Sequence, residues 1–284
     1  ATVDVVHKPS GTHYRAVTND KGVYTINGMR VGGPYEVTVR CIGFAEQKTG
    51  GINLQLGETF NLKTTLSETA KEMQEVMVSA KGSKFSYERT GASTNISNEQ
   101  MIAMPTVSRN VTDFTRLSPY GGNGMTFQGS DGRTANFTVD GANFNNNFGL
   151  SSTLPGGGNP ISMEAIEELQ VVISPFDVRQ TGFIGGALNA ITKSGTNTFK
   201  GQAYVYHQNE NMRGDAVDRE FISGSRDKDR TTTYGFSLAG PIIKNKLFFF
   251  VNGELIKSPG TGTPWRASEN GVGNADAYQS YTTI

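Results

Sequence analysis

Residues 161–198 read ISMEAIEELQVVISPFDVRQTGFIGGALNAITKSGTNT, and this stretch decides the fold. Its acidic start, Ser162–Glu168, predicts a short helix, and the apolar run Leu169–Ile173 predicts a strand directly after it. A glycine-rich turn and a second apolar run, Ala187–Ile191, come next. A polar segment closes the stretch, so we expect a compact α+β domain that ends near residue 196.

The residues after Thr198 alternate between apolar and polar side chains in three runs, near 199–206, 233–239 and 247–254. Each run is close to the 9–11 residues that a tilted membrane strand needs. The link Gly240–Lys246 is short, whereas the segments after the first and third runs are long and polar. Outer-membrane barrels alternate short and long connections in this way. A soluble antiparallel sheet with one apolar face is the alternative.

Residues 1–67 carry short alternating runs that are separated by turn clusters, which predicts a small β-sandwich. The expected strands are Thr2–Val6, Tyr14–Val17, Val23–Ile26, Pro34–Gly43 and Thr59–Leu66. Cys41 is the single cysteine and falls on the apolar phase of the fourth run. We therefore expect a buried thiol and no internal disulfide.

Capping signals upstream of the quoted stretch predict two short helices. Ser97 and Gln100 fit a capping box for the first helix, and Pro105 should end it. Ser108 is expected to cap the second helix, over Arg109–Leu117. Both segments belong to the same expected α+β domain.

Two paired strands are expected between these helices and the quoted stretch, over Gly124–Gln128 and Thr134–Val139. Asp140-Gly141 follows the second one and is a good hairpin turn. Ahead of the helices, residues 68–82 form a polar linker with one β-prone island, Glu75-Val76-Met77-Val78-Ser79. The island is either a separate extended peptide or the last strand of the first domain.

The quoted stretch resembles the end of the plug domain of TonB-dependent outer-membrane receptors, in the branch that contains the Oar-like and SusC-like proteins. The run GPIIKNKLFFFVNGE at 240–254 resembles the early barrel of Oar-like receptors. The run GTHYRAVTNDKGVYTINGMRVGGPYEVTVRCIGF at 11–44 resembles the carboxypeptidase-regulatory-like domain, a transthyretin-like sandwich.

This resemblance implies a mainly β chain in four parts. They are a carboxypeptidase-regulatory-like β-sandwich (1–67), a linker with a TonB box (68–82), an α+β plug domain (83–196), and the first antiparallel strands and extracellular loops of an incomplete transmembrane β-barrel (197–284). A plugged transporter barrel has about 22 strands, so we expect an N-terminal fragment of a longer receptor. The sandwich family usually begins one strand earlier than Ala1, so we also expect an uncovered sheet edge.

The resemblance further implies a transporter of the cell outer membrane that imports a large nutrient, such as a glycan or a peptide. Its sandwich would lie in the periplasm, and TonB would supply energy from the proton gradient. Glu75, Val76, Met77, Val78 and Ser79 would bind TonB by adding a strand to its sheet. Outer-membrane lipid is the second expected partner, and SusC-like relatives add a surface-exposed lipoprotein that binds substrate.

Two plug segments are candidate functional sites. Gly182, Gly185 and Gly186 are the predicted hinge, because coupling to TonB needs a locally weak element. The loop residues Asn143, Phe144, Asn145, Asn146 and Phe148 are the predicted substrate contacts. Their amides could hydrogen-bond to an uncharged solute and their rings could stack on it. A polar loop with two buried phenylalanines is the alternative.

The amino-acid composition argues against several kinds of partner and functional site. The 26 basic and 26 acidic residues balance, so no nucleic-acid partner is expected. The three histidines lie on different segments, so we expect no metal site, and no other cofactor is predicted. Glu164, Glu167 and Glu168 cluster at a helix start, where the helix dipole stabilises negative charge. No catalytic residue is predicted, and the chain is not expected to be an enzyme.

Two other functions stay open from sequence alone. A secreted or surface carbohydrate-binding β protein would use residues 1–67 as its active part and would have no transport activity. An enzymatic alternative treats the first domain as an accessory to a peptidase, although no residue set suggests how hydrolysis would proceed.

Overall fold

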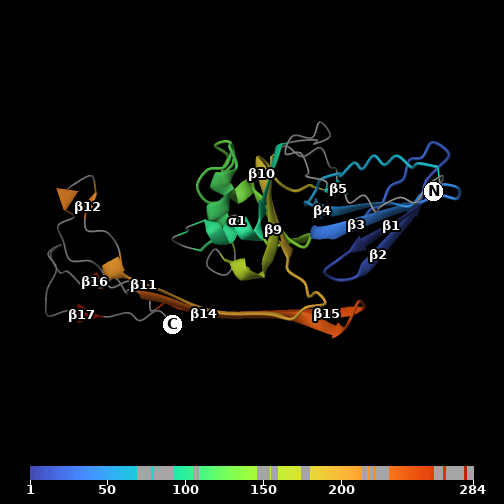
Figure 1. The fold of residues 1–284 in the computed structure, drawn as a ribbon. Helices are drawn as coiled ribbons and strands as arrows, with labels where there is room; N and C mark the ends of the chain where they lie inside the picture. The colour runs from blue at the N-terminus through green and yellow to red at the C-terminus, as the bar shows by residue number, and fades with distance from the viewer. Residues whose placement is uncertain are drawn as a thin grey trace. The chain divides into compact units, whose positions relative to one another are not determined.

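The computed structural model of the chain consists mainly of β-strands (Figure 1). It describes residues 1–68, 92–104, 106, 109–145, 154, 159–173, 180–212 and 230–258, and the backbone of five two-residue strands at 78–79, 216–217, 220–221, 265–266 and 278–279. One compact unit comprises Ala1–Gly201 with Ser237–Asn252, and a second comprises Gln202–Phe236 with Gly253–Ile284. Within the described residues, no helix has the length and apolar character that crossing a membrane requires.

The N-terminal sheet has the strand order β2-β1-β3-β4-β5. Its strands are β1 (Thr2–His7), β2 (Thr12–Val17), β3 (Gly32–Arg40), β4 (Gln47–Leu54) and β5 (Val78–Ser79). One face is apolar because every second residue points toward it. Val3, Val5, Val37 and Val39 are buried on this face and pack around the ring of Tyr35.

The second layer of the expected sandwich does not form strands, so the prediction is wrong at Val23–Ile26 and Thr59–Leu66. Side chains in both segments do alternate between half-buried and exposed. Alternation reports which side chains face a core, whereas a strand also needs a backbone partner. The sequence pattern also missed β4, whose paired glycines and lysine weaken its strand signal. Cys41 follows the end of β3 and is only partly buried, contrary to expectation.

A second sheet lies in the predicted plug domain (83–196, called the plug below) and has the order β6-β9-β10-β7-β8. Its strands are β6 (Ala92–Ser97), β7 (Asn136–Val139), β8 (Ala142–Asn143), β9 (Ile166–Ile173) and β10 (Gly186–Thr192). The expected pairing of Gly124–Gln128 with Thr134–Val139 is wrong, because β7 pairs in parallel with β10 and antiparallel with β8. Parallel pairing joins segments distant in sequence, so local patterns do not reveal it.

The predicted capping box is confirmed at α1 (Asn98–Ala103). Ser97 Oγ accepts a hydrogen bond from the Gln100 amide at 3.4 Å, and Gln100 Oε1 accepts one from the Ser97 amide at 3.0 Å. The second helix is the 3₁₀ helix η1 (Val111–Leu117), which Asn110 caps. The predicted cap, Ser108, lies outside the described residues, as does Pro105.

Three further 3₁₀ turns are η2 (Gly132–Thr134), η3 (Met163–Ala165) and η4 (Glu210–Met212). The acidic helix expected over Ser162–Glu168 is therefore wrong beyond Ala165, because the backbone is already extended and paired in β9 from Ile166. The turn at Asp140-Gly141 is confirmed. Both residues have positive φ, 49° and 83°, as a two-residue type I′ hairpin requires.

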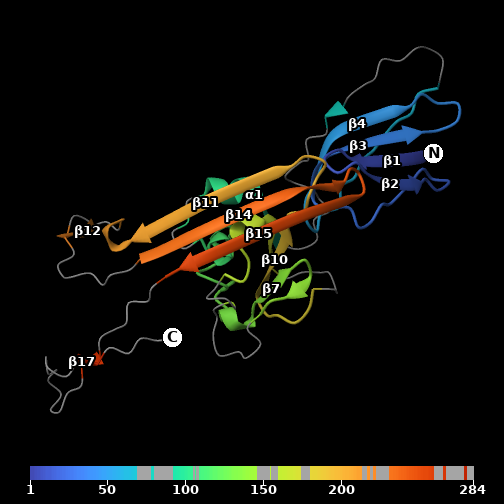
Figure 2. The same cartoon turned by 90° about the horizontal axis from the view of Figure 1, so that it is seen from below.

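Three long strands follow the plug, in the order β11-β14-β15 (Figure 2). They are β11 (Lys200–Asn209), β14 (Arg230–Ile243) and β15 (Leu247–Lys257). The predicted alternation is confirmed in β14: Tyr234, Phe236 and Leu238 are exposed, whereas the residues between them are partly covered. The link between β14 and β15 is only Lys244–Lys246, shorter than expected, because β14 continues to Ile243. Short strands also occur at β12 (Ala216–Val217), β13 (Glu220–Phe221), β16 (Trp265–Arg266) and β17 (Tyr278–Gln279).

Glycines on these strands lie under aromatic rings of neighbouring strands. A Cβ added to Gly240 would lie 2.3 Å from Phe199 Cδ1, and one added to Gly235 would lie 2.0 Å from Tyr204 Cζ. A Cβ on Gly253 would lie 2.7 Å from Phe236 Cε1. Each ring therefore occupies the space that a side chain would need. Such pairs fix the register, since a slip of one residue would place a side chain under the ring.

The Gly240–Phe199 pair gives a test of this packing. Gly240→Ala should lower the free energy of unfolding by about 1–3 kcal/mol, because the new methyl group overlaps the ring. Combining it with Phe199→Ala should cost less than the two single changes added together, since the shorter side chain makes room. Denaturant unfolding of the full-length protein in lipid vesicles measures all three variants. Additive effects, within about 0.5 kcal/mol, would contradict the proposed contact.

Candidate functional site

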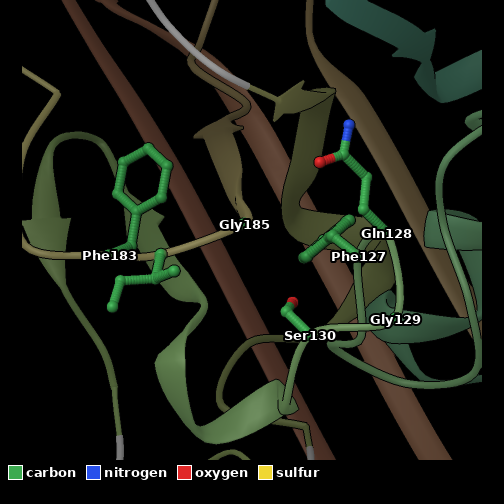
Figure 3. Close-up of a pocket in the computed structure, with 7 residues that line it drawn as sticks. Phe127, Gln128, Gly129, Ser130, Phe183 and Gly185 are labelled. Carbon is green, nitrogen blue, oxygen red and sulfur yellow. The ribbon is translucent and has the colours of Figure 1, made fainter.

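Two segments of the plug domain, Phe127–Ser130 and Phe183–Gly185, line a hollow of about 450 Å³ (Figure 3). The first segment leads toward η2, and the second leads into β10. Figure 3 shows the Ser130 hydroxyl between the two segments, with the Phe183 ring on one side and the Gln128 amide on the other. No residue of this lining carries a formal charge.

The predicted hinge glycines differ in their surroundings. Gly185 has φ of 91°, and a Cβ there would lie 2.5 Å from Ser130 Oγ. A Cβ on Gly186 would lie 2.6 Å from Phe127 Cγ. Gly182 also has positive φ, 84°, but nothing lies within 4 Å of its Cβ position. Gly185 and Gly186 thus allow close packing, and Gly182 alone has free space. The hinge itself stays a prediction.

The chemistry of the hollow follows from Ser130. Its Oγ is buried and has no hydrogen-bond partner among the residues that the structure describes. A buried polar group without a partner is costly, so a ligand that accepts its hydrogen bond would recover that cost. Ile184 at the rim is 71% exposed, and Phe183 is partly buried. The arrangement suits an uncharged ligand with one apolar face and a polar group.

The predicted substrate loop is partly described. Asn145 Oδ1 accepts a hydrogen bond from the Phe137 amide at 2.6 Å, and its Nδ2 donates to Asn136 Oδ1 at 2.7 Å. Asn143 Oδ1 accepts from the Asn145 amide at 2.8 Å. Asn145 therefore supports the edge of β7, while Phe144 is 38% exposed. Asn146 and Phe148 lie outside the described residues, and the substrate role of the loop stays a prediction.

The described part of the predicted loop, Asn143–Asn145, is not among the residues that line the hollow, whereas Phe127–Ser130 are. Our sequence reasoning did not single out this segment as a site. The cluster Gly129-Ser130-Asp131-Gly132 signals a turn. Whether this segment lines a hollow depends on Gly185, which is distant in sequence, and on the positive φ of Gln128, 52°.

The predicted TonB box is described only at Val78–Ser79, and Glu75–Met77 lie outside the described residues. Val78 and Ser79 form β5, which pairs in parallel with Thr49 and Gly50 of β4. This pairing corresponds to the alternative in which the island ends the first domain. TonB binding by this segment remains a prediction.

The glutamate cluster has structural partners. Glu164 is buried, and its Oε1 lies 3.0 Å from Arg109 Nη2. Glu168 is also buried and accepts a hydrogen bond from the Leu56 amide at 3.0 Å. Burial lowers the pKa of Lys193, and the nearby Glu164 and Glu167 oppose that shift. Within the part of the chain that the structure describes, no three side chains are placed to hold a metal ion.

Comparison with known families gives two matches. Residues 1–67 match the carboxypeptidase regulatory-like domain. Residues 191–269 match an outer membrane beta barrel domain. The chain is also 27% identical over 151 residues to the TonB-dependent transporter Oar of Myxococcus xanthus. The predicted resemblance to TonB-dependent receptors is confirmed. The fold class and the outer-membrane location predicted for this chain are confirmed as well.

The match to Oar covers 50% of this chain and 14% of the relative. Among solved structures, the siderophore receptor PirA from Acinetobacter baumannii has a TM-score of 0.44 and 22% identity, over 60% of this chain and 25% of that one. A mutant of the ferric enterobactin receptor PfeA from Pseudomonas aeruginosa has a TM-score of 0.46 and 17% identity, over 63% and 27%. The chain therefore spans about a quarter of these structures.

The unpaired hydroxyl of Ser130 gives a stability prediction. Ser130→Ala should leave the free energy of unfolding unchanged or raise it, because no protein hydrogen bond is lost. Thr115→Val is the matched control: Thr115 Oγ1 donates to the carbonyls of Thr112 and Gly124, each at 2.8 Å. That change should cost about 1 kcal/mol. Denaturant unfolding of the full-length protein compares them, and an equal loss in both variants would show that Ser130 has a partner.

Glu168 gives a pH prediction. Burial raises the pKa of its carboxyl above the ordinary 4.5, and Glu167 adds to the rise, whereas the Leu56 amide opposes it. The folded protein thus holds this proton more tightly than the unfolded chain. The stabilising contribution is complete below about pH 4.5 and is lost as pH rises through the raised pKa.

Glu168→Gln should therefore gain stability relative to the wild type as pH rises above about 4.5. The free energy of unfolding of the full-length protein, measured at several pH values, tests this. Glu99→Gln, on the exposed side of α1, is the control for removal of a surface carboxylate. A Glu168→Gln curve parallel to the wild type would contradict the assignment.

Proposed function

We propose that this chain is part of a TonB-dependent outer-membrane transporter that imports a large nutrient, such as a glycan or a peptide. The proposal rests on the exposed apolar face of β11, β14 and β15. These strands come directly after a plug-type sheet and lie inside the segment that matches an outer membrane beta barrel domain. Phe236 and Val251 on this face are 52% and 50% exposed. A water-soluble protein rarely leaves so many large apolar side chains uncovered.

The imported solute would first rest on the plug. The neutral hollow beside Ser130 and the loop at Asn143–Phe148 are the proposed contacts, and both suit a ligand without charge. A surface lipoprotein that delivers the solute is a further part of the proposal. Gly182 is the proposed hinge position, because it has positive φ and free space around it.

Energy would come from TonB through the segment Glu75–Ser79. Such a segment can add a strand to the sheet of a partner, with backbone hydrogen bonds supplying the affinity. Its described part pairs with β4 over only two residues, Val78 and Ser79. So short a pairing costs little to break, which suits a peptide that must exchange partners.

The TonB step has a direct test in cells that produce the full-length receptor. Val76→Pro together with Val78→Pro should abolish energised uptake, because proline removes two strand amides. Alanine at the same two positions is the control, since it keeps both amides. Uptake of labelled oligosaccharide and oligopeptide pools, with and without a protonophore, measures transport, and binding at the cell surface should survive in every variant.

Uptake by the proline variant at the wild-type rate would overturn the TonB assignment. Protonophore-insensitive uptake by the wild type would overturn the proposed energy source. A soluble, monomeric full-length protein that binds saccharide through residues 1–67 would instead support the secreted carbohydrate-binding alternative.

A further inference from the structure

A row of polar side chains crosses the plug sheet at one register. Asn95 of β6 lies opposite Gln170 of β9, Gln170 lies opposite Asn189 of β10, and Asn189 lies opposite Thr138 of β7. Asn189 Nδ2 donates to Gln170 Oε1 at 3.4 Å, and Thr138 Oγ1 donates to Asn189 Oδ1 at 2.7 Å. Flanking residues such as Leu169 are buried in the apolar core, so the row occupies the other face of the sheet.

One peptide of the first domain docks on this row. The Leu56 carbonyl accepts hydrogen bonds from Asn95 Nδ2 at 2.9 Å and from Gln170 Nε2 at 2.6 Å. The Leu56 amide donates to Glu168 Oε1 at 3.0 Å. Glu168 is 7% exposed and Gln170 is 3% exposed. A single residue of the first domain therefore bridges two neighbouring strands of the plug, β6 and β9.

The bridge involves an edge strand of the plug sheet. β6 is an edge strand, and among the described strands its neighbour in the sheet is β9. β6 is also the first strand after the linker that carries the proposed TonB segment. Tension on that linker would reach β6 before any other plug strand. An edge strand detaches by losing the hydrogen bonds of one ladder, and here the Leu56 carbonyl adds a further tie between the two strands.

The first domain also contacts the segment that leaves the plug. The Asn197 amide donates to the Pro9 carbonyl at 2.9 Å. Asn197 Nδ2 donates to Asn245 Oδ1 at 2.8 Å, and the Asn245 amide donates to Asn197 Oδ1 at 2.9 Å. The first domain is thus bonded near both ends of the plug, at β6 and at Asn197.

We propose that the first domain is a clamp on the plug: the Leu56 peptide staples edge strand β6 to β9 and raises the force needed to detach β6. The physiological source of that force rests on the proposed TonB coupling, but the staple does not depend on it. Release of the Leu56 peptide would be the first step of plug opening. The domain thereby regulates the plug without binding substrate.

Gly57→Ala tests the staple. Gly57 has φ of 70°, and its added Cβ would lie 2.7 Å from Gln170 Nε2, so the amide must move away from Leu56. Gly22→Ala is the matched control, since Gly22 has φ of 76° with nothing within 4 Å of its Cβ position. Both variants carry similar backbone strain, but only the first disturbs the staple. Amide hydrogen exchange in the full-length receptor, in lipid, reports on β6 without any need for transport.

The Ala92–Ser97 amides should exchange about tenfold faster in Gly57→Ala than in Gly22→Ala, since the Leu56 tie is lost. Asn95→Ala, compared with Ser93→Ala on the same face of β6, is a second pair that leaves the first domain unaltered. Equal exchange within both pairs would overturn the clamp. If the Ala92–Ser97 amides exchange faster but uptake by the receptor does not require TonB, the result would support the staple and reject the proposed function.

Discussion

Strand β9 is the element on which the plug depends, because its backbone is paired on both edges. β6 and β10 flank it, and its own two faces meet different surroundings. Leu169 and Val171 point into the apolar core with the phenylalanines of the domain. Glu168 and Gln170 point the other way and hold the Leu56 peptide. A change in the register of β9 would exchange these faces, so both the core and the docking surface rest on one alignment.

Features set by neighbouring residues could be predicted from the sequence. The Ser97–Gln100 capping box and the Asp140-Gly141 turn each depend on a few consecutive residues, and both occur as expected. The alternation of apolar and polar residues along β14 is also confirmed, because a period of two residues is a property of the strand itself. The same alternation also indicates which face of β14 is apolar, since apolar residues occupy every second position.

Features set by distant partners could not be predicted. Thr59–Leu66 alternates correctly but finds no partner strand, and β7 pairs in parallel with β10. The hollow at Ser130 exists because Gly185 lets a second segment approach it. The Leu56–Glu168 bond joins residues 112 positions apart. No periodicity or spacing near Leu56 signals that bond, since a backbone amide carries no mark in the sequence.

The three-residue link between β14 and β15 has a consequence for biogenesis. Asn245, with φ of 61°, lets the chain reverse direction between two long strands that are consecutive in sequence. Closing so short a loop costs little chain entropy, so this hairpin can assemble early during folding. The apolar face of the hairpin would then be exposed to water before the polypeptide reaches a bilayer. Export of such a hairpin therefore requires a chaperone that covers this apolar face until the chain reaches the membrane.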